Sequence, residues 1–375
     1  MTLDMAAERL PRVYAEIMRG MEAGWHRGAQ VYVSRGGQVA AEFTVVELDV
    51  GESRPGVPIT RDTLVLWLSS GKPVGSVAIL QLRERGKLEL DDPVCNHLPE
   101  FAGGGKQAVT IRHLLTHTGG FRWVDLDWAH MSWDQIIAKI CAARLERGWV
   151  PGERAGYHPT TSWYILGELV RRIDGRPYSQ YVREEIFEPL GLHDCWIGMP
   201  LAQYQAYGDR LAIVPDTSKP DAPPQRYSSE RGATQCVPGG NGVGPMRQLA
   251  RFYEMLLAGG TLAGVRILLP DSVRLMTTPQ RVGMFDETFK HVMDWGLGTI
   301  INSNRYGAAT VPYGYGPLCS DRTFGHGGSQ SSSAFADLQY GLVVAAMLNG
   351  MPGEKVHDGR MRAFHEALYR DLGLG

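Results

Sequence analysis

Long hydrophobic runs are missing from this chain of 375 residues. No apolar stretch approaches the roughly 18 residues that a membrane-spanning helix needs. Residues 1–25 alternate apolar with charged side chains and carry acids early, a pattern typical of an amphipathic helix rather than of a secretion signal. The sequence therefore predicts no membrane partner and a cytoplasmic location.

Cysteine pairs and an excess charge of one sign are also lacking. The five cysteines are widely spaced, odd in number and free of any C-x-x-C pair, as is typical of reduced thiols in a cytosol. The net charge is −2 and acids and bases are mixed, so the chain offers no basic stripe to a phosphate backbone. We therefore predict no nucleic-acid partner.

Several familiar motifs are absent or incomplete. The chain contains no G-x-S-x-G pentapeptide, which argues against an α/β-hydrolase lipase, and the glycine-rich run 239–244 lacks the spacing of a nucleotide loop. His113 and His117 have the i, i+4 spacing of zinc-binding helices, but no glutamate of an H-E-x-x-H motif lies between them. We interpret both histidines as packing residues and predict neither a metal nor an organic cofactor.

Strand-like patterns are present at both ends of the chain. Residues 29–48 form two β-rich runs around Gly36 and Gly37, which predicts a hairpin with a two-residue turn. Residues 331–338 and 341–349 predict two further strands, followed by a last helix over 359–373. Because the sheet elements come from both ends, we predict one integrated unit over 1–375.

Helical patterns fill the middle of the chain. We predict a helical lobe over about 88–200, with helices at 111–117, 132–148 and 162–175. Residues 201–240 are rich in Pro, Asp, Ser and Gly and predict a long surface loop, after which a helix follows at 246–260. The predicted fold is α/β (α+β), an antiparallel sheet flanked by helices from about 1–87 and 240–375, plus the inserted helical lobe. A small-molecule site is expected in the cleft between the lobes.

Ser69 and Lys72 open a predicted helix that follows the apolar run 63–68. Residues three apart on a helix share one face, about 5 Å from each other. This helix is apolar on nearly every side and should be buried. A buried lysine loses solvation, which lowers its pKa and lets the neutral amine take a serine proton. Alternatively, Ser69 is only a helix cap and Lys72 a surface residue, but burial of the helix argues against this.

Two further motifs follow along the chain. Ser69-Ser70-Gly71-Lys72 is followed by Tyr157-His158-Pro159 and by His326-Gly327-Gly328. In this order the motifs resemble those of the serine β-lactamase and penicillin-binding protein superfamily, in particular its class C, family VIII carboxylesterase and D-aminopeptidase-like branch. The second lies where the family has Tyr-x-Asn, and the third where it has Lys-Thr-Gly or His-x-Gly. The resemblance covers roughly residues 20–350.

The resemblance implies a role for each motif. Tyr157 would work with Lys72 as the general base toward Ser69 and then protonate the leaving group. A neighbouring ammonium is expected to bring the pKa of Tyr157 down toward the operating range. The N–H groups of Ser69 and Ser329 would form the oxyanion hole. The further substrate-binding residues implied are His326, Gly327 and Gly328. Without the other motifs, a packing aromatic would be the more common interpretation of Tyr157, and a turn with an incidental histidine would be a reasonable interpretation of the glycine pair.

Two departures from the family pattern bear on the substrate. Pro159 replaces the asparagine and His326 the lysine, which weakens the expected grip on the amide and carboxylate of a β-lactam. Aromatic residues in 121–133 and 304–316 favour a bulky or partly apolar substrate, although solvent-shielding packing would look the same.

We therefore predict a serine hydrolase that acts on small-molecule esters or amides through an acyl-Ser69 intermediate and is most similar to esterases. Three alternatives stay open at this point. The enzyme could be an acyltransferase that passes the acyl group to an amine or alcohol, or a β-lactamase or D,D-peptidase. It could also be a non-catalytic binding or sensor protein that kept the fold. The oligomeric state is not indicated.

Overall fold

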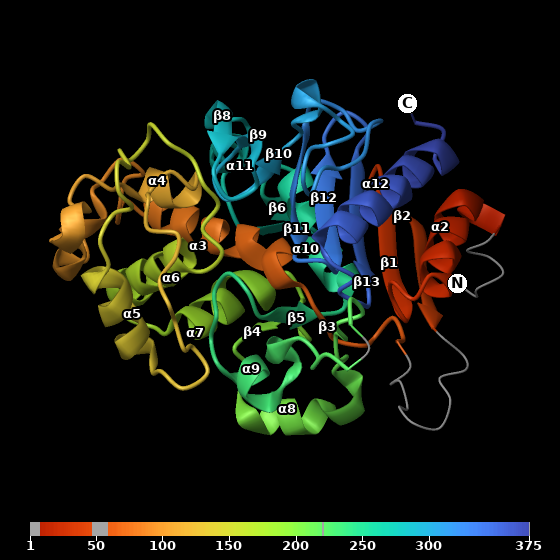
Figure 1. Cartoon of the computed structure of the whole chain (residues 1–375), viewed down its shortest axis with the longest axis horizontal. Coiled ribbons are helices and arrows are strands. Elements are labelled where there is room, and N and C mark those ends of the chain that lie inside the picture. Colours follow the sequence, from red (N-terminus) through yellow and green to blue (C-terminus); the bar gives the residue numbers. More distant parts are fainter. Residues whose placement is uncertain (1–7, 47–58, 220, 375) are drawn as a thin grey trace.

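An eight-stranded antiparallel sheet forms the centre of the computed structural model, which describes residues 8–46, 59–219 and 221–374. In sheet order its strands are β2 Gln38–Val46, β1 Gly28–Arg35, β13 Leu342–Leu348, β12 Ser332–Asp337, β11 Thr323–Gly328, β10 Ile300–Ile301, β9 His291–Trp295 and β8 Arg281–Asp286. Strands from both ends of the chain are thus neighbours at β1 and β13, which confirms the predicted sheet (Figure 1).

The predicted hairpin is formed by β1 and β2. Gly36 and Gly37 have φ angles of 58° and 77°, the left-handed conformation that a two-residue turn of this kind requires at both positions. Residues 1–7 of the predicted first helix and 47–48 of the predicted hairpin lie outside the described residues. The helix itself is α2, Pro11–Glu22.

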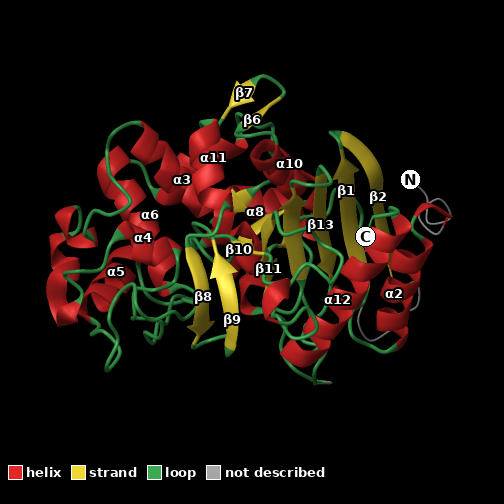
Figure 2. Cartoon of the chain, turned by 90° about the horizontal axis from the view of Figure 1, so that it is seen from above, coloured by secondary structure: helices red, strands yellow, loops and turns green. Residues whose placement is uncertain are grey.

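Helices cover both faces of the sheet. On one face α2 packs against α12, Glu354–Asp371, and on the other α10, Met246–Leu257, contacts β1, β12 and β13 (Figure 2). Every residue of β12 and β13 is buried as a result, which explains the unbroken apolar run of β13. The last helix begins five residues before the predicted start at 359.

The second lobe is built from helices, as predicted. Its α-helices are α4 Ile111–Leu115, α5 Trp133–Ala142, α6 Thr161–Asp174 and α7 Tyr178–Val182. The helix α3, Lys72–Glu84, joins this lobe to the sheet because it contacts α6, α7 and β11. All its residues from Lys72 to Leu82 are buried, which confirms that it is central. The predicted helix 132–148 is shorter, because Ala143 is extended.

Short elements account for the differences from the predicted fold. The segment 201–240 is not a continuous loop but contains α8, Leu201–Tyr207, and α9, Glu230–Thr234, which are too short to show helical periodicity. A second, three-stranded sheet was not predicted. The remaining strands are β3 Val65–Leu66, β4 Trp196–Ile197, β5 Gly242–Gly244, β6 Thr261–Leu262 and β7 Val265–Arg266, and the remaining α-helix of the described residues is α11 Pro270–Thr277. No helix in the described part of the chain is both long and apolar enough to span a membrane.

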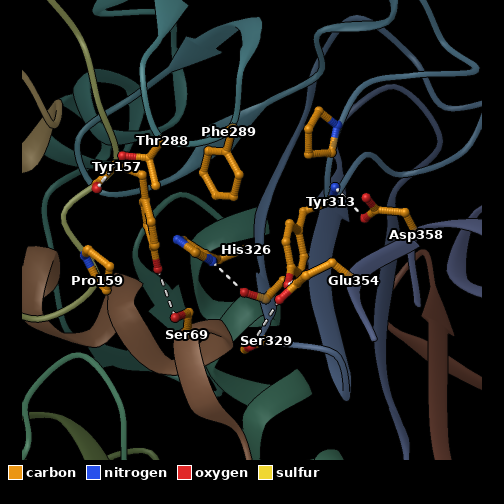
Figure 3. A pocket seen from close by; sticks show the side chains of 12 residues that line it. Ser69, Tyr157, Pro159, Thr288, Phe289, Tyr313, His326, Ser329, Glu354 and Asp358 are labelled. Atoms are coloured by element: carbon orange, nitrogen blue, oxygen red, sulfur yellow. Dashed lines mark hydrogen bonds between the residues drawn. The ribbon is translucent and has the colours of Figure 1, made fainter. Parts of the chain in front are cut away.

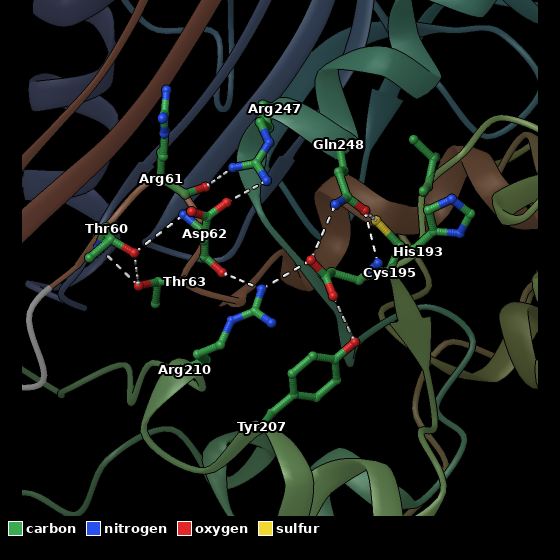
Figure 4. Close-up of polar contacts among 12 residues, drawn as sticks. Thr60, Arg61, Asp62, Thr63, His193, Cys195, Tyr207, Arg210, Arg247 and Gln248 are labelled. Atoms are coloured by element: carbon green, nitrogen blue, oxygen red, sulfur yellow. Dashed lines mark hydrogen bonds and ion pairs between the residues drawn. The ribbon is translucent and has the colours of Figure 1, made fainter. Parts of the chain in front are cut away.

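Ion pairs hold the three-stranded sheet against the α/β lobe (Figure 4). Arg210, which follows α8, donates to a carboxylate oxygen of Asp194 and to the backbone oxygen of Asp62, each at 3.0 Å. Arg247 of α10 pairs with the Asp62 carboxylate at 2.6 Å. These contacts fix the segment leading into β3, and Ser69 follows directly after that strand.

Candidate active site

A tight backbone turn places Ser69 at the entrance of α3. Residues Leu68–Gly71 form one turn of 3-10 helix, and Leu68 has a φ of 51°, a left-handed conformation that is uncommon for a residue other than glycine. Ser69 is half-buried and lines a cavity. The adjacent Ser70 is buried and donates from its Oγ to the carbonyl of His326 at 3.0 Å. The two neighbouring serines thus face different surroundings.

Lys72 lies directly behind Ser69. Its Nζ is 2.9 Å from Ser69 Oγ and 2.9 Å from the carbonyl oxygen of Pro159, and it also donates to the carbonyl of Gly239. The side chain is 0% exposed, and burial lowers the pKa of Lys72 well below its ordinary value. The three partners are uncharged, so they do not restore the cost of desolvating an ammonium. The lowered pKa agrees with the sequence prediction.

Tyr157 approaches Ser69 from the helical lobe. Its phenol O–H donates to Ser69 Oγ at 2.8 Å, and its ring stacks on Trp295 with the centroids 5.8 Å apart. Burial raises the pKa of Tyr157 above its ordinary value. The expected lowering of this pKa is therefore wrong for the free protein, because desolvation of the phenolate outweighs the opposing effect of the hydrogen bond to Ser69. The lowered pKa of Lys72 also disfavours the ammonium that was expected to stabilise the phenolate. Tyr157 stands beside Ser69 as a neutral phenol.

A buried ion pair that the sequence did not indicate positions Tyr157. Asp286 accepts from the backbone N–H of Tyr157 at 3.0 Å and pairs with Arg281 at 3.0 Å, and both charged side chains are at most 1% exposed. They lie at opposite ends of β8, which bends at a bulge. No local pattern distinguishes these two residues from an ordinary surface pair.

The third motif, His326-Gly327-Gly328, forms the end of strand β11 and pairs with β12. The alternative that the two glycines form a turn therefore does not hold. A side chain at Gly327 would place its Cβ 2.3 Å from the ring of Tyr313, and one at Gly328 would come 2.3 Å from the carbonyl of Trp67. Glycine is therefore required where this strand passes the 3-10 turn that carries Ser69. Ser329 follows, half-buried, at the end of the strand.

His326 is 1% exposed and is held as one tautomer. Its Nδ1 lies 2.7 Å from the carbonyl oxygen of Gly327, which can only accept, so Nδ1 carries the proton. Burial lowers the pKa of His326 to about 3, so the imidazole is neutral. A permanent positive charge, as the family's lysine would provide, is absent from this position.

A cavity of about 440 Å3 opens in front of these groups (Figure 3). Its lining residues are Ser69, Tyr157, Pro159, Thr288, Phe289, Pro312, Tyr313, His326, Gly327, Ser329, Glu354 and Asp358. The stretch 304–316 thus contributes to the cavity, whereas none of the described lining residues comes from 121–133. Thr288, Phe289, Glu354 and Asp358 were not singled out from the sequence.

His113 and His117, the two histidines with the spacing of zinc ligands, have different structural roles. His113 accepts at Nδ1 from the backbone N–H of Thr110 and so caps α4. His117 is buried against the rings of Tyr157 and Trp295, with centroids 4.8 Å and 4.6 Å away. Both contacts are those of packing and capping residues.

Comparison with known proteins identifies the family. The Beta-lactamase family matches residues 15–368, and the chain belongs to this family. Esterase EstB of Burkholderia gladioli is 27% identical over 396 aligned positions, which cover 94% of each protein. Two solved structures have a TM-score of 0.78 and cover 97% of both chains. They are a penicillin-binding protein homologue from Caulobacter crescentus at 29% identity and a family VIII carboxylesterase at 28%. The predicted family is confirmed, and the protein is an enzyme of the serine-hydrolase class.

Proposed function

We propose that the protein hydrolyses small-molecule esters or amides, preferentially esters, through an acyl-enzyme intermediate on Ser69. The observation that carries the proposal is the position of Ser69 Oγ, 2.9 Å from Lys72 Nζ and 2.8 Å from the Tyr157 hydroxyl. The similarity to EstB and to a family VIII carboxylesterase supports ester substrates.

Lys72 is suited to be the base in the acylation step. The carbonyls of Pro159 and Gly239 take up both N–H bonds of a neutral amine, which leaves its lone pair for the hydroxyl proton of Ser69. Ser69 Oγ then attacks the substrate carbonyl carbon, and the proton moves to Lys72 as the bond forms. We propose that the N–H groups of Ser69 and Ser329 donate hydrogen bonds to the negatively charged oxygen that forms on the attacked carbonyl.

Tyr157 is suited to deliver a proton to the leaving group. Its phenol is neutral in the free enzyme, lines the cavity and donates toward Ser69 Oγ, where the departing alcohol or amine must collect a proton. Lys72 can return the proton it took from Ser69 through Tyr157, since both lie beside the same oxygen atom. Water then attacks the acyl-Ser69 ester by the reverse sequence and releases the acid.

The test is whole-protein mass spectrometry after a fluorophosphonate probe, followed by a panel of p-nitrophenyl esters, anilides and nitrocefin. We expect one adduct per chain at Ser69 and fastest turnover with the esters. Labelling without turnover of any panel member would contradict the hydrolase proposal and favour a sensor that retained the fold.

Acceptors other than water offer a second test of the same intermediate. If acyl-Ser69 forms, a primary amine or alcohol that enters the cavity can attack it in place of water. We expect added acceptors to divert part of the product to amide or ester, measured as the product ratio by chromatography. Hydrolysis alone across a broad set of acceptors would favour a dedicated esterase over an acyltransferase.

β-Lactams are expected to be poor substrates. Pro159 lacks the amide of the family's asparagine, and no lysine or arginine is among the described residues that line the cavity. A charge-assisted hydrogen bond to the β-lactam carboxylate is worth about 1.5–3 kcal/mol, so its absence should lower nitrocefin turnover about ten- to hundredfold relative to an enzyme that has such a partner, and we expect nitrocefin to be turned over more slowly than the p-nitrophenyl esters. A slow acyl-enzyme at Ser69 should be visible by mass spectrometry. Rapid turnover without an accumulating adduct would restore a β-lactamase as the better assignment.

A further inference from the structure

Two carboxylates from the start of α12 form one wall of the cavity. Glu354 and Asp358 are one helical turn apart, and both line the space in front of Ser69 (Figure 3). Tyr313 holds both of them, because its hydroxyl donates to Glu354 Oε2 at 2.6 Å and its backbone N–H donates to Asp358 Oδ1 at 3.3 Å. The hydrogen bonds from Tyr313 therefore fix the positions of both carboxylates, which line the same cavity as Ser69.

No lysine or arginine among the described residues forms an ion pair with Glu354 or Asp358. Glu354 receives hydrogen bonds only from uncharged donors, which are Tyr313, Ser329 and Gln330. The charge of Arg362, one turn beyond Asp358, lowers the pKa of that carboxyl, but this effect is smaller than the raising effect of burial, and Arg362 does not line the cavity. Lys72 is fully buried behind Ser69 and donates there to backbone carbonyls.

His326, which lines the same cavity, carries an acceptor that has no partner in the described part of the chain. His326 Nε2 is buried and has no hydrogen-bond partner within the described residues. Since Nδ1 carries the ring proton, Nε2 presents a lone pair, and it lies on the side of the ring that faces Tyr157 (Figure 3). A buried acceptor without a partner costs free energy until a donor fills the place. The atom is covered by protein in this conformation, so it does not itself contact a ligand there.

Aromatic faces complete the surroundings. The rings of Phe289 and Tyr313 both line the cavity, with centroids 5.8 Å apart. Aromatic faces attract ammonium groups as well as apolar ones.

Burial raises the pKa of Asp358, and the charge of Glu354 adds to this shift. A bound cation would offset that repulsion.

From the carboxylate wall and the aromatic faces of the cavity, we propose that the enzyme selects esters or amides that carry a cationic ammonium group, on either the acyl or the leaving portion. The proposal rests on the catalytic role of Ser69 given above, since it concerns the cavity in front of that residue. It predicts that cationic substrates are favoured over neutral ones, and that substrates with a carboxylate, such as a penicillin, are disfavoured.

The experiment compares cationic substrates with neutral analogues of similar shape. Acetylthiocholine against S-neohexyl thioacetate places the charge on the leaving portion. p-Nitrophenyl 6-aminohexanoate against the heptanoate places it on the acyl portion. We expect kcat/KM for the cationic member to be at least about tenfold higher in one of the two pairs, through a charge-assisted hydrogen bond of the primary ammonium or a partly desolvated cation–π contact of the quaternary one. The ratio should fall with added salt, because the wall is partly exposed.

Variants assign the preference to the wall. In Glu354→Gln combined with Asp358→Asn the cationic-to-neutral ratio should fall about tenfold, whereas the matched Glu366→Gln, on the same helix but outside the cavity, should keep the wild-type ratio. Ratios near or below one in both pairs, or a ratio unchanged in the double variant, would overturn the proposal. If the neutral esters are still turned over through Ser69 in that case, only the charge selection fails. Turnover that survives Ser69→Ala would overturn the proposed function instead.

Discussion

Ser69→Ala is expected to abolish fluorophosphonate labelling and to lower ester turnover by at least about ten-thousandfold, the scale seen when a nucleophile that acts with its base as one unit is removed. The reason is geometric, because both Lys72 Nζ and the Tyr157 hydroxyl converge on this one oxygen atom. Initial rates with p-nitrophenyl esters and intact-protein mass after labelling measure the two effects.

Ser70→Ala is the matched control for this prediction. Ser70 Oγ also carries hydrogen bonds, to the carbonyl of His326 and to Ser332 Oγ at 3.0 Å each, but it is buried and lies outside the cavity lining. Its loss should lower the melting temperature and leave most of the turnover and the full labelling. Equal losses in the two variants would show that the choice of nucleophile is wrong.

The candidate site could largely be predicted because its parts lie in local patterns. Ser69 and Lys72 share one face of a helix whose apolar surroundings are visible in the sequence, so their contact is a matter of helix geometry. Tyr157 is 88 residues from Ser69, and only the order of the three motifs in the resembled family placed it in the same site. The hairpin at Gly36 and Gly37 was equally local.

The parts that could not be predicted depend on contacts between distant segments. The strands β8, β9 and β10 form one edge of the large sheet, next to β11. The stability of such strands depends on the strands they pair with more than on the propensity of their own residues. Gly359 interrupts the helical pattern of α12, so the predicted helix began after Glu354 and Asp358 and the acidic wall was missed. The pKa of Tyr157 reflects burial by Trp295 and Phe289, which no local pattern shows.

Lys72→Met and Tyr157→Phe should each lower kcat/KM for esters by more than about a hundredfold, the usual scale for a general acid or base. A base must be deprotonated to act, so wild-type activity is expected to fall as the pH drops through the lowered pKa of Lys72. Tyr157→Phe should keep this acid limb of the profile, and Lys72→Met should remove it. A pH profile of kcat/KM from single-variant kinetics separates the two roles.

Each variant has a matched control elsewhere in the chain. Lys106 is also 0% exposed and donates to the carbonyls of Gly103 and Cys141, and the buried Tyr315 donates to the carbonyl of Ile300 at 3.0 Å. Lys106→Met and Tyr315→Phe should therefore cost stability, read from thermal melts, with little change in kcat/KM. Comparable catalytic losses in the controls would show that burial of the group, rather than its place beside Ser69, decides the effect.

The double variant tests whether Lys72 and Tyr157 act as one unit. If the proton of Ser69 passes between them, removing the second group after the first should add little, and the combined loss should be close to the larger single loss. If the combined loss equals the product of the single losses, the two groups act independently. In that case Tyr157 would position Ser69 through its hydrogen bond without carrying the proton, and Lys72 alone would be the base.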